Sequence, residues 1–377
     1  MGPLQVASIA PQLYNAAMQF NGTDTNHLYI LAGDIGGTNT SLALVRDDEG
    51  QFSIRSRRVY PTQELSSLSE AIRDALEAFR AELGSLDIQA SCLSIAGPVV
   101  DNRCVPTNIS WSLDGREIEK EFGFRTLVIN DFTAICYGIP LLNPDDPSEL
   151  TPLPHPGGTS PIPTEYLPGV GVQAVVGAGT GLGVGYLIAE QSRILALPAE
   201  GGHVDYAPFD EITLQLRNWM AEKLEEAPEP EMFISGIGIA NLFRFMREAR
   251  NADSEILRRI EELPDAEKPQ AISAAADEDE TCAQIMTMFV RMYARVAHNL
   301  ALGYIPKKGL FLAGGIAAKN KRWFLEDDRF MKAFLHNYQP TIRPVLDNIP
   351  VYIVEDYKIS LYGAAHAFVQ LTKFIHP

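Results

Sequence analysis

The alternation of apolar and polar residues along this chain predicts two glycine-tipped β-hairpins. Within residues 31–45, an apolar run enters a glycine-rich turn and alternating apolar residues leave it; residues 174–187 repeat the pattern. Such a tip cannot carry bulky side chains, and its glycines let backbone N–H groups approach an anion. Two similar hairpins suggest two similar halves with one nucleotide held between them. Two unrelated tight hairpins are the alternative.

Strand and helix periods continue through the first half of the chain. Its further predicted elements are strands at 52–60, 92–96 and 126–131 and helices at 67–84 and 117–122. The first helix opens at Ser67 and has Glu70 three residues later, a spacing typical of a capping box. The resulting βββαβα order is typical of an α/β domain.

The second half repeats this order after a connection, 143–168, whose Pro, Gly, Asp and Ser content is typical of a long surface loop. Its predicted elements are strands at 194–197, 309–313 and 351–354 and helices at 212–224, 281–304 and 365–374. The charged, Ala-rich residues 252–280 predict an exposed helical insertion. We expect an N-terminal extension at 1–26, partly helical at 13–18, a small domain at 27–141 plus about 357–377, and a large domain at 142–356.

Charge and composition narrow the class of protein. The net charge of −17 argues against a nucleic-acid partner, whose phosphates need a basic face. The four cysteines form no Cys-x-x-Cys pair, so neither a zinc site nor a disulfide framework is indicated. No apolar run reaches the roughly 18 residues of a membrane span, and the start of the chain lacks the features of a secretory signal. We therefore expect a cytoplasmic protein without nucleic-acid or membrane partners.

Polar clusters follow the apolar strands, at the carboxyl ends where open α/β sheets collect their ligands. They are Asp34 with Gly36, Gly37 and Thr38; Asn130 with Asp131; Gly179 with Thr180; and Gly314 with Gly315. No Gly-x-x-x-x-Gly-Lys-Ser/Thr motif occurs, so the chain is not a P-loop enzyme. The segment 169–174 imitates a dinucleotide fingerprint, but it precedes a strand instead of following one, and we discard it.

Two of these regions suit acid–base chemistry and hydroxyl recognition. Burial of an unpaired Asp at the end of an apolar strand is unfavourable, so such a residue is expected to take part in catalysis or to bind a ligand. Asp131 could instead cap the helix that follows it. Glu200 and His203 flank a Gly-Gly turn and suit the binding of vicinal hydroxyls, whereas His203 taken alone would be a surface histidine. Asp34 can hold a metal, and Thr38 can hydrogen-bond a phosphate.

Six motifs together resemble the bacterial-type (group A) ATP-dependent glucokinases of the actin/Hsp70/sugar-kinase superfamily. They are Gly33-Asp-Ile-Gly-Gly-Thr38, Thr107-Asn-Ile-Ser-Trp111, Ile129-Asn-Asp-Phe-Thr133, Gly177-Ala-Gly-Thr-Gly-Leu-Gly183, the segment 197–208 and Leu312-Ala-Gly-Gly-Ile316. The resemblance implies a two-domain actin-like ATPase fold, ribonuclease H-like, with a duplicated βββαβα core and a central cleft. It also implies phosphorylation of D-glucose at the 6-hydroxyl by ATP, the first step of glycolysis.

The same resemblance implies a role for each motif residue. Asp131 is the expected catalytic base. The expected sugar ligands are Asn108, Asn130, Asp131, Glu200, His203 and Glu231. The expected nucleotide ligands are Asp34, Gly36, Gly37, Thr38, Gly179, Thr180, Gly314 and Gly315, and Asp34 faces Mg²⁺ through water. Since the sugar ligands come from both halves, we expect glucose to bridge the cleft and its binding to close it.

Other functions stay open on the same fold. The protein could phosphorylate another hexose, such as mannose or an amino sugar, or act as a non-catalytic sugar sensor, although the chain has no room for a DNA-binding helix-turn-helix before residue 28. An actin- or Hsp70-like ATPase is disfavoured because the polar clusters at Asp131 and Glu200 suit a small polyol. The sugar-kinase branch related to repressors carries a Cys-rich zinc motif, whereas this chain has no cysteine between His203 and Cys282. We also expect a homodimer that binds glucose and ATP.

Overall fold

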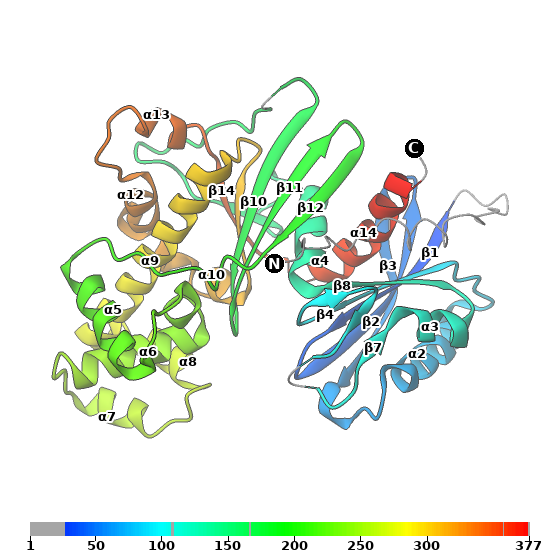
Figure 1. Cartoon of the computed structure of the whole chain (residues 1–377), viewed down its shortest axis with the longest axis horizontal. Helices are drawn as coiled ribbons and strands as arrows, with labels where there is room; N and C mark the ends of the chain where they lie inside the picture. Colours follow the sequence, from blue (N-terminus) through cyan, green and yellow to red (C-terminus); the bar gives the residue numbers. More distant parts are fainter. Residues whose placement is uncertain (1–26, 107–108, 166, 357, 376–377) are drawn as a thin grey trace, which may run out of the picture. The chain divides into compact units, whose positions relative to one another are not determined.

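The computed structural model describes residues 27–106, 109–165, 167–356 and 358–375, which divide into two compact units (Figure 1). Unit 1 contains the described residues of Met1–Leu141, Ser192–Ala196 and Lys358–Pro377; unit 2 contains those of Leu142–Gln191 and Leu197–Tyr357. The expected extension at 1–26, with its helix at 13–18, lies outside the described residues. The domain boundaries 27–141 plus about 357–377 and 142–356 stay our proposal.

Unit 1 is built on a five-stranded sheet. Its strands are β1 (Leu28–Ile35), β2 (Asn39–Asp48), β3 (Gln51–Pro61), β4 (Ala90–Ile95) and β8 (Arg125–Asn130), in the order β3-β2-β1-β4-β8. The first three strands pair antiparallel, as the hairpin pattern predicts, whereas β1–β4 and β4–β8 pair parallel. Every residue of β4 is buried, which is typical of a strand covered on both faces.

Helices and short elements complete unit 1. The helices are α2 (Leu68–Leu83), α3 (Gly115–Phe122), α4 (Asp131–Gly138), α14 (Ile359–Ile375) and the 3₁₀ turns η2 (Thr62–Glu64) and η3 (Ile139–Leu141). A small second sheet consists of β5 (Val99–Val100), β6 (Arg103–Cys104) and β7 (Leu113–Asp114). The apolar faces of α2 and α3 pack in one cluster with β1, β2 and β4, while Figure 1 shows α4 and α14 side by side.

The predicted capping box of α2 forms only in part. The Ser67 side chain accepts a hydrogen bond from the Glu70 N–H, as expected of an N-cap residue. The Glu70 carboxylate, however, accepts from the backbone N–H and the hydroxyl of Ser66, not from the N–H of Ser67. The serine that precedes the cap offers two donors to the carboxylate, and this local competition replaces the reciprocal bond of the box.

Helices α4 and α14 approach each other at glycines. A Cβ atom on Gly363 would collide with the Ala134 carbonyl oxygen and lie 2.7 Å from the Gly138 nitrogen. At the same crossing, His366 Nδ1 lies 2.7 Å from the Tyr137 carbonyl oxygen. The two helices therefore touch backbone to backbone.

Unit 2 carries a six-stranded sheet with the same core order. Its strands are β9 (Leu150–Pro152), β10 (Val170–Ala178), β11 (Leu182–Glu190), β12 (Arg193–Ala199), β13 (Leu310–Ala313) and β14 (Val351–Val354), in the order β12-β11-β10-β13-β14-β9. The hairpin β10–β11 is antiparallel, and β10–β13 and β13–β14 are parallel. Apart from β9, this arrangement repeats the order of unit 1, so the predicted α/β class with a duplicated βββαβα core is confirmed.

The helices of unit 2 bury its largest apolar cluster around α9. They are α5 (Glu211–Leu224), α6 (Gly236–Glu248), α7 (Glu255–Glu261), α8 (Lys268–Ala275), α9 (Glu280–Tyr304), α10 (Gly315–Lys319), α11 (Lys321–Leu325), α12 (Arg329–Leu335) and α13 (Arg343–Leu346), with 3₁₀ turns η4 (Pro230–Met232) and η5 (Glu326–Asp328). On one face of α9, the side chains of Ile285, Phe289 and Met292 are completely buried. No helix among the described residues combines the length and apolarity needed to cross a bilayer.

Two predictions for unit 2 are wrong in part. The connection 143–168 is not wholly a surface loop, because β9 pairs with β14 and the side chain of Leu153 is buried. The insertion at 252–280 is helical, as predicted, but it is not merely exposed. Leu257 and Ile272 are completely buried in the core of unit 2, and these few large apolar residues are enough to anchor α7 and α8.

Replacement of Gly363 by alanine tests the helix crossing. The added methyl group has no space at the Ala134 carbonyl, so α4 and α14 must separate. We expect a loss of roughly 1–3 kcal/mol in the free energy of unfolding, the usual penalty for overpacking. Gly303→Ala is the matched control, because nothing lies within 4 Å of its added Cβ in α9. That variant should be neutral or more stable by up to about 1 kcal/mol. Equal stability of both variants in urea denaturation would contradict the close crossing.

Candidate active site

In unit 1, two half-buried carboxylates lie at the carboxyl ends of parallel strands. Asp34 is the penultimate residue of β1, and Asp131 directly follows β8 as the first residue of α4. Burial raises the pKa of Asp131 above its usual range, and the negative charge of Asp34 raises it further. The sheet therefore brings together two acidic groups that the sequence separates by almost a hundred residues.

Asn130 orients Asp131. Its side-chain oxygen caps α4 by accepting from the N–H groups of Phe132 (2.9 Å) and Thr133 (3.2 Å). Its Nδ2 donates to Asp131 Oδ1 at 2.9 Å and to the Gly97 carbonyl at 3.2 Å. The alternative that Asp131 is the helix cap is therefore wrong, because Asn130 takes that position. A sugar contact of Asn130 would have to share or replace one of these bonds.

Residues of two other elements of unit 1 influence Asp34, one through a hydrogen bond and one through its charge. The Ser360 hydroxyl, near the start of α14, donates to Asp34 Oδ2 at 2.7 Å. On the sheet, Ser41 is the cross-strand neighbour of Asp34, and Arg57 donates to the Ser41 hydroxyl at 2.8 Å. Burial raises the pKa of Asp34, while the hydrogen bond from Ser360 and the charge of Arg57 act in the opposite direction.

The tip of the β1–β2 hairpin is pinned through its carbonyl groups. The Gly36 N–H donates to the Asn39 carbonyl at 2.9 Å and closes the turn. The Thr62 hydroxyl donates to the Gly36 carbonyl at 2.7 Å, and Gln63 Nε2 donates to the Gly37 carbonyl at 2.9 Å. Since these carbonyl groups are held by η2, the exposed residues Gly37 and Thr38 stay in a defined conformation.

In unit 2, the predicted sugar ligands Glu200, His203 and Glu231 come together around one turn. The His203 N–H donates to the Glu200 carbonyl at 3.1 Å, and the Glu231 N–H donates to the Gly202 carbonyl at 3.2 Å. Glu231 Oε2 also accepts from the Leu182 N–H at 2.7 Å, which ties η4 to the start of β11. Gly202 is needed here because a Cβ atom would collide with the Leu182 carbonyl oxygen.

Three carboxylates surround His203. Its Nδ1 lies 2.8 Å from Glu229 Oε2, a contact that the sequence gave no reason to expect. That hydrogen bond raises the pKa of His203, and the charges of Glu231, Glu229 and Glu200 raise it further. The cluster therefore favours a protonated imidazole and offers acceptors for the hydroxyl groups of a polyol.

The second predicted phosphate-binding tip, between β10 and β11, lies beside two other elements of unit 2. The Gly179 N–H donates to the Gly181 carbonyl, and the Gly236 N–H at the start of α6 donates to the Gly179 carbonyl, both at 2.9 Å. Gly314, at the end of the neighbouring strand β13, has φ +84° and contacts the Ala178 carbonyl, so Gly315 begins α10 close to this tip. Thr180 is exposed.

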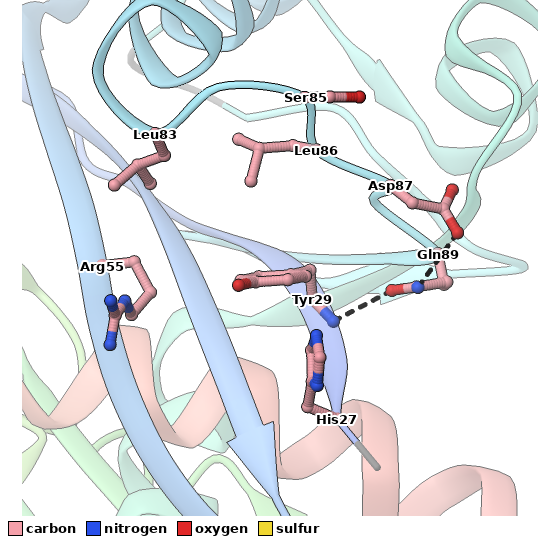
Figure 2. Close-up of a pocket in the computed structure, with 8 residues that line it drawn as sticks. All are labelled: His27, Tyr29, Arg55, Leu83, Ser85, Leu86, Asp87 and Gln89. Atoms are coloured by element: carbon pink, nitrogen blue, oxygen red, sulfur yellow. Dashed lines mark hydrogen bonds between the residues drawn. The ribbon is translucent and has the colours of Figure 1, made fainter. Parts of the chain in front are cut away.

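A separate surface pocket in unit 1 contains none of the predicted site residues. Figure 2 shows it at the start of β1, where the Tyr29 N–H donates to Gln89 Oε1 at 2.9 Å, with Arg55 and Leu86 on its walls. Asp34 is five residues further along β1, roughly 17 Å away at the rise of a strand. Ligands of open α/β sheets collect at the carboxyl ends of strands, so this pocket is not the candidate active site.

Comparison with known proteins identifies the family. The family model described as Glucokinase matches residues 31–371. A glucokinase of Nostoc punctiforme is 34% identical over 352 residues, which cover 89% of this chain and 97% of the relative. The chain belongs to the glucokinase family. The prediction of a glucokinase, an enzyme that phosphorylates glucose with ATP, is thereby confirmed.

Solved structures of the glucokinase family share the fold. Glucokinase from an Antarctic psychrotroph superposes with a TM-score of 0.74 at 28% identity, covering 91% of this chain and 98% of that one. Glucokinase from Balamuthia mandrillaris, solved in complex with glucose, has a TM-score of 0.69 at 26% identity, covering 94% and 96%. The predicted two-domain actin-like fold is confirmed by these neighbours.

The sequence of this glucokinase-family chain predicts the carboxylates of the candidate site, but not the residues that form hydrogen bonds with the site. Asn108, predicted to bind sugar, lies outside the described residues. The hydrogen bond from Ser360 to Asp34 could not be predicted from the sequence, because the two residues are 326 positions apart. Glu229 stands in a Pro-Glu-Pro-Glu run with the predicted ligand Glu231, so its position could have drawn attention, but its partner His203 could not be read from that run.

The buried charge of Asp131 predicts a gain in stability when it is removed. A carboxyl whose pKa is raised in the folded state binds its proton more tightly there than in the unfolded chain. The ionised form at neutral pH therefore lowers the free energy of unfolding. We expect Asp131→Asn to melt a few degrees higher than the parent at pH 7 in calorimetry, while Asp101→Asn, at an exposed position, should not. The gain should shrink as pH falls toward 3.8, the usual carboxyl pKa. A lower melting temperature at pH 7 would refute the proposed burial effect.

Proposed function

We propose that this protein transfers the γ-phosphoryl group of ATP to the 6-hydroxyl of D-glucose, with Asp131 as the catalytic base. The observation that carries this proposal is the oriented carboxylate of Asp131, whose Oδ1 accepts from both Asn130 Nδ2 and the Phe132 N–H at 2.9 Å. Membership of the glucokinase family and the glucose complex of the relative from Balamuthia mandrillaris support the choice of substrate.

Asp131 suits the removal of a proton from an alcohol. A raised pKa makes a carboxylate a stronger base, and general bases work best when their pKa lies nearer to the operating pH. In the proposed step, Asp131 accepts the 6-hydroxyl proton as the sugar oxygen attacks the γ-phosphorus in line and ADP leaves. Phosphoryl transfer depends mainly on positioning and charge neutralisation, so the rigid hold of Asn130 on the carboxylate contributes directly.

For the sugar, we propose that Glu200, His203 and Glu231 bind the hydroxyl groups remote from the reacting one, together with Asn108 and Asn130. The turn of unit 2 supports this assignment because it concentrates carboxylate acceptors and one imidazole. Carboxylates accept hydroxyl protons in charge-assisted hydrogen bonds, which are stronger than neutral ones.

For the nucleotide, we propose that the two hairpin tips bind the phosphates and that Gly314 and Gly315 border the adenosine. The first tip offers Gly36, Gly37 and Thr38; the second offers Gly179 and Thr180. The positive end of the α6 dipole beside the second tip supports an anion there. These local dipoles matter because the chain as a whole carries a net charge of −17.

Mg²⁺ fits the residues around Asp34. Mg²⁺ prefers oxygen ligands and is usually held by one or two carboxylates with phosphates and water, not by an all-protein cage. Among the described residues, no three or more His, Cys, Asp or Glu side chains are arranged so that they could hold a metal ion together, and Asp34 offers a carboxylate already fixed by Ser360. We propose that Asp34 faces the ion through water; when bound, the ion neutralises charge on the ATP phosphates.

We place the chain in the bacterial-type group A branch, because no cysteine stands between His203 and Cys282 to form the zinc motif of the repressor-related branch. We propose a cytoplasmic homodimer that takes glucose and ATP. The second candidate, a kinase for mannose or an amino sugar, uses the same residues and differs only in the hydroxyl contacts.

Asp131→Asn tests the reaction. This variant keeps the size of the side chain and an oxygen for the Phe132 N–H, but it removes the base. We expect kcat to fall by about 10²–10⁴, with little change in glucose affinity, in an assay that detects glucose 6-phosphate. Near-parental turnover would remove Asp131 from the mechanism, and phosphate transfer to mannose alone would favour the second candidate.

Galactose and Glu200→Gln test sugar recognition. Inversion of one hydroxyl leaves polar partners unpaired, at about 1–3 kcal/mol each, so galactose should be a far poorer substrate than glucose. Glu200→Gln should lower kcat/KM for glucose much more than it weakens ATP binding, measured by calorimetry. The exposed Glu226→Gln serves as the control for lost charge. Indifference of the enzyme to Glu200→Gln would refute the role of this turn.

A further inference from the structure

The carboxylate of Glu229 is presented to His203 by a constrained backbone. Glu229 lies between Pro228 and Pro230 and directly precedes η4. The Glu229 carbonyl accepts from the Met232 N–H at 3.1 Å, and the Pro228 carbonyl accepts from the Tyr206 N–H at 3.0 Å. Proline on both sides limits the backbone dihedrals, so little conformational freedom remains in the segment that carries this carboxylate.

We propose that Glu229 is a positioning residue that orients the His203 imidazole for sugar binding, by holding the proton on Nδ1 and leaving Nε2 for a glucose hydroxyl. The inference rests on the proposed role of His203 as a sugar ligand. Its geometric basis is the 2.8 Å distance between His203 Nδ1 and Glu229 Oε2. Glu229 is assigned no contact with the sugar itself.

The chemistry of the imidazole ring explains why such a partner matters. A neutral imidazole has one N–H donor and one acceptor nitrogen, and the group bonded to one nitrogen decides the character of the other. A carboxylate can only accept, so Glu229 keeps the proton on Nδ1 in both protonation states of the ring. Nε2 then accepts from a sugar hydroxyl when the ring is neutral and donates to one when it is protonated.

Glu229 is distinct from the other acidic groups that face His203. The Glu231 carboxylate accepts from the Leu182 N–H, and Glu200 accepts from the His203 N–H through its backbone carbonyl. Both carboxylates act on the imidazole through charge, as Glu229 also does, but only Glu229 has its carboxylate hydrogen-bonded to the ring. Loss of Glu229 should therefore change the tautomer as well as the charge balance, whereas loss of either neighbour should change the charge balance alone.

The experiment uses the full chain and compares Glu229→Gln, Glu229→Ala and the control Glu226→Gln. Gln keeps an oxygen that can accept from Nδ1 but loses the charge, and Ala loses both. Two-bond ¹H–¹⁵N spectra report the tautomer and titration of each of the seven histidines, and His203→Asn assigns the signal of His203. Steady-state kinetics with glucose and with ATP give the separate values of kcat and KM.

We expect both Glu229 variants to shift the titration of His203 to lower pH, and Glu229→Ala alone to lose the preference for Nδ1–H. The KM for glucose should rise about three- to tenfold in Glu229→Ala, the range for one lost hydrogen bond, with partial recovery in Glu229→Gln. The kcat and the KM for ATP should stay within about twofold of the parent, because Glu229 is neither the proposed base nor one of the proposed ATP ligands. Glu226→Gln should change none of these values.

Two outcomes overturn the inference in different ways. If His203→Asn raises the KM for glucose but Glu229→Ala leaves both that KM and the His203 tautomer unchanged, the positioning role of Glu229 is wrong and the proposed sugar site stands. If His203→Asn has no effect on glucose, the assignment of His203 in the proposed function is wrong, and the positioning role falls with it. In that case, a shifted His203 titration in Glu229→Gln would still establish the pair as a purely structural contact.

Discussion

The partial burial of two carboxylates at the carboxyl ends of strands β1 and β8 of one sheet is the constraint on which unit 1 depends. Asp34 and Asp131 are desolvated, and the charge of Asp34 raises the pKa of Asp131. Such an arrangement is unfavourable unless the surroundings hold it in place, because burial of charge opposes folding. Asn130 and Ser360 provide that hold through hydrogen bonds, and in return the protein keeps a carboxylate that is a stronger base than an exposed one.

The helix crossing at Gly363 connects this electrostatic arrangement to packing. It fixes α14 against α4. Helix α14 carries Ser360, which donates to Asp34, and α4 begins with Asp131 directly after its cap Asn130. A change in the crossing distance would displace α4, which begins with Asp131, relative to α14, which carries the Ser360 partner of Asp34. The packing of these two helices therefore affects the surroundings of both carboxylates. For this reason the methyl group added by Gly363→Ala should matter although Gly363 is not a site residue.

In unit 2, hydrogen bonds from neighbouring elements likewise fix a group of acidic side chains. We propose that its acidic turn binds sugar hydroxyls, and hydrogen bonds from the Leu182 N–H of β11 and the Glu231 N–H of η4 fix the conformation of this turn. Gly202 permits the close approach, and the hydrogen bond to Glu229, together with the charges of the neighbouring carboxylates, raises the pKa of His203. A protonated imidazole would offset part of the repulsion between these carboxylates, so protonation of His203 would stabilise the proposed sugar-binding turn.

The sequence by itself determined the core strands of both units and pointed to the candidate site residues. Local periodicity and glycine-tipped turns sufficed for the hairpins, for the duplicated strand order and for Asp34, Asp131, Glu200 and His203, because these signals lie within a few residues of each other. Tertiary structure alone decided the partners, such as Ser360 for Asp34 and Glu229 for His203, and it buried Leu257 in a segment that looked exposed. Which donor meets which carboxylate depends on contacts between residues distant in the chain, and no local pattern encodes them.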